Sequence, residues 1–206
     1  MLKLYNSDIC PFAHRARLVV TAKGIEHERI AIDLREMPQW YRDLSPNQSV
    51  PFLQHDEKGI PESLIIMQYL DEAFGGLKLT PEDPFLRAKM RLAFDTIGSK
   101  LVSAISPAFK NPEFQLPKDE ELWAPLEASL DADGPFWLGA QLTLADLAAY
   151  PWFERWAILE KRTNRKLNLP PKLKRWLQAV STQPAVLKEA HPDEFYLDYF
   201  QQPSLR

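Results

Sequence analysis

The chain has 206 residues, of which 45% are hydrophobic and 26% are charged, and its formal net charge is −3 at pH 7. This composition is typical of a globular protein with a sizeable core, and it excludes a disordered chain and a strongly basic protein that attracts nucleic acid or anionic membranes. We expect no signal peptide, because the first residues lack a basic stretch followed by a long apolar one, and no transmembrane helix, because no apolar run reaches about eighteen residues. The single cysteine cannot form an intramolecular disulfide, which fits a reducing compartment, so the sequence predicts a cytoplasmic protein.

Strand and helix patterns alternate over the first 78 residues. Pro11 stands where a first helical residue is expected and Gly24 where the helix ends, so we expect a helix through about Ala22. Ser63 is the predicted N-cap of a later helix. In chain order, the sequence predicts strands at 2–5, 28–33, 50–54 and 59–61 and helices at 11–22, 37–44 and 64–74. The first two strands, which a helix connects, should be parallel, and the last two, which a tight turn connects, should be antiparallel.

The rest of the chain has helical patterns only. Residues 75–84, "GGLKLTPEDP", have the glycines and prolines of a linker, so we place a boundary here between a first domain at 1–78 and an all-helical second domain at 85–206. The helices predicted for the second domain lie at 85–106, 118–130, 142–159, 172–180 and 184–190. Thr143 and Asp146 have the spacing of a capping box, and Pro151 is expected to kink the helix that they begin.

Cys10 lies between a predicted strand and the helix that Pro11 begins. The N-terminus of a helix carries unpaired amides and the positive end of the helix dipole, and both stabilise an anion. Such a setting can lower the pKa of a cysteine from about 8.5 to roughly 3.5–7.5, and Arg15 and Arg17 add positive potential. The alternative is a buried cysteine that serves as a small apolar residue.

The absence of a second cysteine indicates the reaction partner of this thiol. A dithiol redox motif has a second cysteine three residues after the first, but that residue is Ala13 here. A disulfide at Cys10 must therefore be formed with another molecule, and a small cytosolic thiol is the simplest candidate.

Four motifs, in this order, resemble the glutathione transferase superfamily: "CPFAHR" at 10–15, "VPFL" at 50–53, "PES" at 61–63 and "TLAD" at 143–146. The first motif is most similar to the omega class and its relatives, including the dehydroascorbate reductases, which use a catalytic cysteine. The resemblance covers nearly the whole chain and implies the glutathione transferase fold, an α/β thioredoxin-like N-terminal domain followed by an all-α C-terminal domain. It also implies a homodimer that forms through the face of the helix at 85–106.

The resemblance assigns roles to residues around the thiol. Cys10 would be the catalytic residue that forms a mixed disulfide with glutathione, and Phe12 would pack near its sulfur. Val50 would bind the cysteinyl part of glutathione through its backbone, and Pro51 would be a cis-proline beside the thiol. The alternative for Pro51 is an ordinary proline of an edge strand.

The same resemblance concerns the two ends of glutathione. Glu62 would pair with the γ-glutamyl ammonium, and the helix N-terminus at Ser63 would bind the carboxylate, although Ser63 would cap a helix in any protein. Omega-class proteins usually have a lysine for the glycine carboxylate, where this chain has Met37. Arg35 is a candidate substitute for that lysine.

A second resemblance offers a different function. The stretches at 44–53 and 62–74 resemble stringent starvation protein A, a transferase-fold regulator that binds bacterial RNA polymerase. That family lacks a catalytic cysteine, so Cys10 argues against it, whereas Met37 is compatible with it. A regulator would tolerate replacement of Cys10 by serine, and a thiol transferase would not.

Other candidate sites are weaker. The segment 161–175 contains seven basic residues and no acidic one, but it has no aromatic residue for base stacking, so we expect a solvated helix end and loop and no nucleic-acid partner. The four histidines are scattered, which predicts no metal site. Phe109, Trp152 and Trp156 could line a substrate pocket, although their helical spacing favours core packing for most of them.

Residues and resemblance together predict a glutathione-dependent thiol transferase or reductase. The Cys10 thiolate would attack a small electrophilic or disulfide substrate, and a second glutathione would release the mixed disulfide. We expect glutathione as co-substrate, a homodimer, and no partnership with a membrane.

Overall fold

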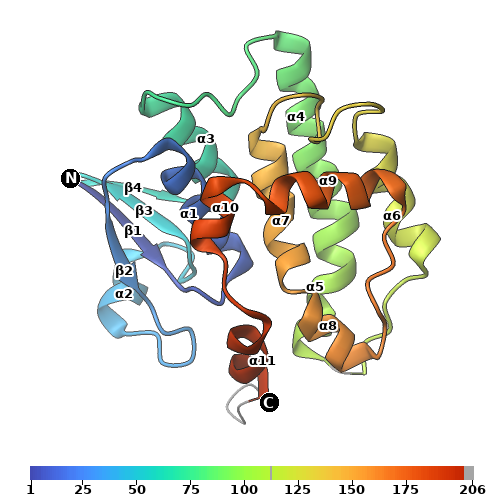
Figure 1. Cartoon of the computed structure of the whole chain (residues 1–206). Helices are drawn as coiled ribbons and strands as arrows, with labels where there is room; N and C mark the ends of the chain where they lie inside the picture. Colours follow the sequence, from blue (N-terminus) through green and yellow to red (C-terminus); the bar gives the residue numbers. More distant parts are fainter. Residues whose placement is uncertain (112, 202–206) are drawn as a thin grey trace. The chain divides into compact units, whose positions relative to one another are not determined.

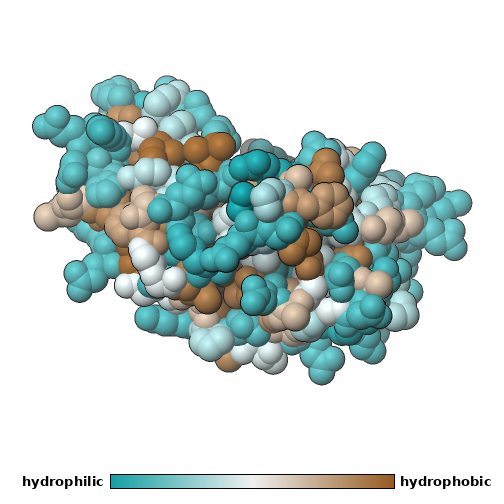
Figure 2. Space-filling view, turned by 90° about the horizontal axis from the view of Figure 1, so that it is seen from above, coloured by the Kyte–Doolittle hydropathy of each residue, from teal (hydrophilic) through white to brown (hydrophobic). Residues whose placement is uncertain are grey.

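The computed structural model describes residues 1–111 and 113–201. The chain divides into two compact units, Met1–Lys78 and Leu79–Arg206 (Figure 1). Within the described residues, no helix combines the length and the apolarity that a membrane span requires. On the face that Figure 2 shows, hydrophilic side chains predominate and hydrophobic ones occur in small groups between them.

The first unit contains a four-stranded mixed sheet with the strand order β2-β1-β3-β4. Its strands are β1 (Leu2–Asn6), β2 (Glu28–Ala31), β3 (Phe52–His55) and β4 (Lys58–Pro61). The β1–β2 pair is parallel and the β3–β4 pair is antiparallel, which confirms both predictions, and β3 also pairs antiparallel with β1. Four of the five residues of β1 are buried, as expected for a central strand.

Three helices accompany this sheet, α1 (Pro11–Lys23), α2 (Gln39–Leu44) and α3 (Ser63–Ala73). Helix α1 begins at Pro11, and Gly24 ends it in the left-handed conformation with φ 63°, which only glycine adopts without strain. Helices α1 and α3 lie side by side (Figure 1), and a buried ion pair joins them, with Lys23 Nζ 2.9 Å from Asp71 Oδ1.

The start of α3 differs from the prediction. Ser63 is the first helical residue and not the N-cap, which is Glu62. Glu62 has φ 71° and turns the chain one residue earlier than the sequence pattern suggests. The Ser63 hydroxyl is therefore not used as a cap, and it accepts a hydrogen bond from Arg15 Nη1 at 3.2 Å.

The second unit is helical, and residues 79–111 and 113–201 contain no strand longer than an isolated bridge. Its elements are α4 (Pro84–Thr96), the π-helix η1 (Ile97–Val102), α5 (Ser103–Lys110), α6 (Asp119–Ser129), α7 (Leu144–Glu154), α8 (Trp156–Thr163), α9 (Pro171–Ser181), α10 (Pro184–Glu189) and α11 (Asp193–Gln201). The helix predicted at 85–106 thus extends to Lys110 and includes a π-helical segment. The sequence pattern did not predict α11, which contacts α8. A mixed α/β unit is thus followed by a helical unit, as the sequence predicts.

Asp146 organises the core of the second unit. Its carboxylate accepts hydrogen bonds from the backbone N–H and the hydroxyl of Thr143, which completes the capping box of α7. It also accepts from the Trp137 backbone N–H at 2.7 Å and from Trp176 Nε1 at 2.9 Å. Burial raises the pKa of Asp146, whereas these four donors oppose that shift. Pro151 lies inside α7, and the helical stretch is interrupted only at Arg155.

Candidate active site

Cys10 stands at the junction of β1 and α1. It is the N-cap residue of α1, with an extended backbone (φ −78°, ψ 120°), and its side chain makes no cap hydrogen bond. The residue is 9% exposed, and its Sγ lies 3.7 Å from the Val50 carbonyl oxygen, to which the thiol donates. The sulfur is thus held at the positive end of a helix dipole, the place that the sequence predicted for it.

The turn that precedes Cys10 is held by a buried arginine. Arg17 Nη1 donates to Asn6 Oδ1 and to Asp8 Oδ1, both at 3.1 Å, and Asn6 Nδ2 donates to Asp8 at 2.7 Å. The Cys10 backbone N–H donates to the Ser7 carbonyl at 3.0 Å and closes the turn. The charge of Arg17 is therefore paired with Asp8, and its main effect is to fix the backbone that leads into the thiol.

Arg15 has a different environment. It is 4% exposed, and its Nη1 donates to Ser63 Oγ at 3.2 Å. Burial lowers the pKa of Arg15 to about 10, and the charge of Cys10 acts in the opposite direction. The guanidinium carbon also lies 5.2 Å from the ring centroid of Phe12, in a cation–π contact.

A small apolar cluster surrounds the thiol. Its buried members are Tyr5, Cys10, Ala13, Ile32, Tyr41, Val50 and Phe52, and Ile30, Met37 and Leu44 pack against it. The ring of Tyr5 contacts those of Tyr41 at 5.4 Å and Phe52 at 5.9 Å between centroids. Burial raises the pKa of Tyr41 to about 12, with smaller upward contributions from the charges of Tyr5 and Cys10. Met37, where the resemblance expected a lysine, brings no charge to this cluster.

The residues predicted to bind glutathione in the first unit lie as follows. The Val50–Pro51 peptide bond is cis, and Val50 places its carbonyl beside the Cys10 sulfur. Glu62 and Ser63 stand at the start of α3, and the Glu62 carboxylate accepts from Asn47 Nδ2 at 2.7 Å. The structure therefore brings Cys10, Val50 and, through Arg15, Ser63 together. Phe12 is 37% exposed next to the thiol in the chain.

From the sequence, Arg15 was expected to add only a general positive potential, and Asn47 was not a predicted site residue. The signal for Arg15 is its spacing of five residues from Cys10 on a helix whose whole middle is buried. A buried arginine needs partners, and this requirement could have pointed to the start of α3. Asn47 gives no such signal, because its contact with Glu62 depends on the loop between α2 and β3.

The aromatic residues predicted for a substrate pocket are buried within the second unit. Phe109 and Trp152 form an edge-on pair at 6.1 Å between ring centroids, and Phe200 of α11 lies 5.9 Å from Phe109. Trp156 is 3% exposed and packs on Trp123 at 5.3 Å. These positions are typical of a core, and the role of the three residues in substrate binding stays a prediction.

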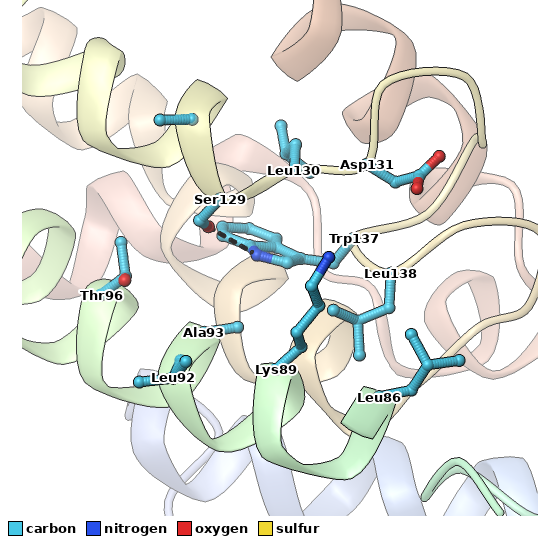
Figure 3. Close-up of a pocket in the computed structure, with 11 residues that line it drawn as sticks. Leu86, Lys89, Leu92, Ala93, Thr96, Ser129, Leu130, Asp131, Trp137 and Leu138 are labelled. Carbon is cyan, nitrogen blue, oxygen red and sulfur yellow. Dashed lines mark hydrogen bonds between the residues drawn. The ribbon is translucent and has the colours of Figure 1, made fainter. Parts of the chain in front are cut away.

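A cavity of about 240 Å³ in the second unit has other walls. It lies between α4 and the end of α6 with the loop that follows, and its floor includes Trp137, whose Nε1 donates to Ser129 Oγ at 2.8 Å (Figure 3). Leu86, Lys89 and Leu92 of α4 form one side. None of the residues predicted to bind glutathione or substrate lines this cavity.

The basic segment 161–175 is bound to its own unit. Arg165 forms an ion pair with Asp119 of α6 and holds the pKa of that carboxyl below its usual range. Arg175 Nη2 donates to the Ala132 carbonyl at 2.8 Å, and Arg162 Nη2 donates to the Phe200 carbonyl at 3.2 Å. Much of the positive charge is therefore used in internal contacts. Among residues 1–111 and 113–201, no group of three or more metal-ligating side chains is placed to hold a metal ion.

Comparison with known proteins agrees with this architecture. The first unit matches the family model of the glutathione S-transferase N-terminal domain over residues 4–78, and the second unit matches the model of the C-terminal domain over residues 120–179. The chain is 36% identical to glutathione S-transferase omega-1 from Sus scrofa over 193 residues, which cover 90% of this chain and 79% of that protein.

Solved structures of glutathione transferases are similar to this chain as well. Rice GST1, solved in complex with glutathione, is 26% identical, with a TM-score of 0.80 over 97% of this chain and 94% of that one. Glutathione transferase Omega 3C from Trametes versicolor has the same fold, with a TM-score of 0.80, 24% identity and coverage of 97% and 90%. The comparisons give no support to the alternative resemblance to stringent starvation protein A. The chain therefore belongs to the glutathione S-transferase family and is an omega-like member of it.

Proposed function

We propose that the chain is a glutathione-dependent thiol transferase or reductase in which Cys10 is the catalytic nucleophile. The observation that carries this proposal is the position of its only thiol, at the N-terminus of α1, beside the Val50 carbonyl and close to the buried Arg15. Both the helix dipole and the guanidinium favour the thiolate, which is the form that attacks disulfides and electrophiles.

The reaction proceeds by two thiol–disulfide exchanges. The Cys10 thiolate attacks the glutathionyl sulfur of a mixed disulfide, a Cys10–glutathione bond forms, and the substrate sulfur leaves as a thiolate that takes a proton from water. The thiolate of a second glutathione then attacks the glutathione sulfur on Cys10. This step releases oxidised glutathione and restores the Cys10 thiolate, so the net reaction converts the mixed disulfide and one free glutathione into the substrate thiol and oxidised glutathione.

Glutathione is the proposed co-substrate and lies along the first unit. Val50 offers its backbone to the cysteinyl part, Pro51 follows it beside the thiol, and Glu62 and Ser63 receive the γ-glutamyl end. Asn47 holds the Glu62 carboxylate for the ammonium group. We propose small substrates, such as mixed disulfides, dehydroascorbate-like oxidants and S-glutathionyl adducts, in the cytoplasm.

The proposed enzyme is also a homodimer. Phe85 and Leu92 of α4 are 67% and 66% exposed and lie seven residues apart, which places them on one face of the helix. Leu86 and Leu92 line the neighbouring cavity (Figure 3). Lys89 lies between Phe85 and Leu92 on α4 and covers the ring of Phe85, so the face combines exposed apolar groups with one charge, beside a cavity of mixed polarity. Such a surface suits the same face of a second copy, because an isologous interface needs protrusions and hollows on one surface.

The test compares the wild type with Cys10→Ser in glutathione-dependent reduction of the mixed disulfide of glutathione and 2-mercaptoethanol. We expect the variant to lose activity by at least about a hundredfold, because serine cannot form the mixed disulfide. Intact-mass measurement after incubation with oxidised glutathione should show one adduct on the wild type and none on the variant. Equal activities, or an inactive wild type without an adduct, would contradict the proposal.

A further inference from the structure

We propose that Arg15 is a positioning residue that acts on both Cys10 and Ser63. Its charge keeps the Cys10 thiolate available, and its hydrogen bond orients the Ser63 hydroxyl toward the carboxylate of a bound γ-glutamyl group. The second half of this inference rests on the proposed function, whereas the first half concerns the protein without any ligand.

The Arg15 guanidinium lies close to the first residues of both α1 and α3. Arg15 follows Cys10 by five residues on α1 and donates to Ser63, the first residue of α3, so its guanidinium lies between the starts of the two helices. It is 4% exposed, and charges interact more strongly in such an environment than in water. An interaction between Arg15 and the Cys10 charge that favours one ion favours the other equally, and the raising effect of Cys10 on the Arg15 pKa is one side of it.

The Ser63 hydroxyl can bind Arg15 and a ligand at the same time. A hydroxyl group has one proton to donate and can accept through its oxygen. Ser63 Oγ accepts from Arg15 Nη1, so its own proton remains to be donated to another acceptor. At the N-terminus of α3, where the backbone amides of the first turn favour an anion, a carboxylate is the acceptor that fits. Arg15 therefore selects the hydroxyl orientation that suits a ligand carboxylate.

Arg17, two residues further along α1, provides a comparison with Arg15. Its Nη1 lies 3.1 Å from Asp8 Oδ1, so a carboxylate of the same unit balances its charge. It acts on the turn before Cys10. The guanidinium that reaches α3 is that of Arg15, which contacts the hydroxyl of Ser63 there.

The charge half is tested on the free protein. Because Cys10 is the only cysteine, the rate of alkylation by iodoacetamide as a function of pH reports its ionisation alone. We expect the midpoint of this profile to rise by about one pH unit in Arg15→Met, and to stay near the wild-type position in Arg15→Lys and in Ser63→Ala. Arg15→Gln provides a second neutral variant if Arg15→Met fails to fold, as judged by circular dichroism. Identical midpoints in the neutral variants and the wild type would overturn this half.

The orientation half is tested with S-methylglutathione, which occupies the proposed site but cannot form a disulfide. We expect Arg15→Lys and Ser63→Ala each to weaken binding about fivefold, because lysine keeps the charge but not the planar donor fork. The double variant should bind no more weakly than either single one, since both break the same link. Additive losses would overturn this half. If the proposed function fails, the wild type will show no glutathione-dependent activity, but the alkylation result will be unaffected. The two failures can therefore be told apart.

Discussion

Cys10 is surrounded by groups from four parts of the first unit. The turn after β1 fixes its backbone, Val50 contacts its sulfur, Arg15 lies on the same helix, and the ring of Tyr41 belongs to the same buried cluster. Of these groups, the helix N-terminus and the Arg15 guanidinium are the ones that favour a negative charge on the sulfur. At the scale of single residues, the site is therefore sensitive to each charge that is added or removed.

Met37 provides a prediction at this scale. It packs against the Cys10 cluster, at the place where the omega class usually has a lysine for the glycine carboxylate of glutathione. We expect Met37→Lys to tighten the binding of S-methylglutathione by about two- to fivefold, because a partly exposed ion pair contributes up to about 1 kcal/mol. Isothermal calorimetry at low and at moderate salt measures this effect.

Two observations check the interpretation of that variant. γ-Glutamylcysteine, which lacks the glycine, should bind equally to the wild type and to Met37→Lys. The gain for S-methylglutathione should also shrink as the salt concentration rises. A gain of the same size for both ligands would show that the lysine acts elsewhere.

At the scale of elements, α1 and α3 carry the proposed site between them. The Lys23–Asp71 pair joins them at the other end of α1, with side chains that are 0% and 1% exposed. Lys23 Nζ also donates to the Leu77 carbonyl at 2.6 Å. This buried pair keeps the two helices in register, and with them Cys10 and Ser63.

Removal of one partner should therefore destabilise the first unit. We expect Asp71→Ala to lower the free energy of unfolding by about 3–5 kcal/mol, because it leaves the Lys23 charge buried without its partner. Chemical denaturation, followed by circular dichroism, measures the change. Lys3 and Glu28 form an exposed pair at 3.7 Å in the same unit, so Glu28→Ala is the matched control and should cost less than about 1 kcal/mol. Similar costs for the two variants would contradict the assignment.

The elements show how far a sequence can predict this structure. Pro11 and Gly24 mark the ends of α1 because their backbone restrictions act locally, and the capping box of Thr143 and Asp146 is local as well. The start of α3 was misplaced by one residue, because the positive φ of Glu62 leaves no trace in residue type.

Contacts between distant parts of the chain were harder to predict from the sequence. Helix α11 escaped prediction because its nine residues are held by tertiary contacts, such as the hydrogen bond from the Tyr196 hydroxyl to Glu154. In the candidate site, the sequence indicated Cys10 and, through the resemblance, Glu62 and Ser63. The link from Arg15 to Ser63 spans 48 residues and became visible only in the structure.

At the scale of the whole molecule, the proposed homodimer is the property to test. The face of α4 carries Phe85 and Leu92, and a carboxylate in place of the Leu92 side chain would be costly to bury in an interface. We expect Leu92→Glu to convert the dimer into a monomer at micromolar concentration, as measured by size-exclusion chromatography with light scattering.

A second exposed leucine provides the control for that experiment. Leu187 of α10 is 63% exposed, close to the exposure of Leu92, but it does not belong to the α4 face. Leu187→Glu should therefore leave the dimer intact. A wild type that elutes as a monomer, or a monomer produced equally by both substitutions, would contradict the proposed interface.

The solitary thiol also determines how the protein withstands oxidants. If peroxide converts Cys10 to a sulfenic acid, the chain has no second cysteine that could trap it as an internal disulfide. Only an external thiol can then form the disulfide that prevents further, irreversible oxidation to the sulfinic acid. Glutathione would thus be both the substrate of this enzyme and the protector of its catalytic residue, and depletion of glutathione would inactivate the protein permanently as well as deprive it of substrate.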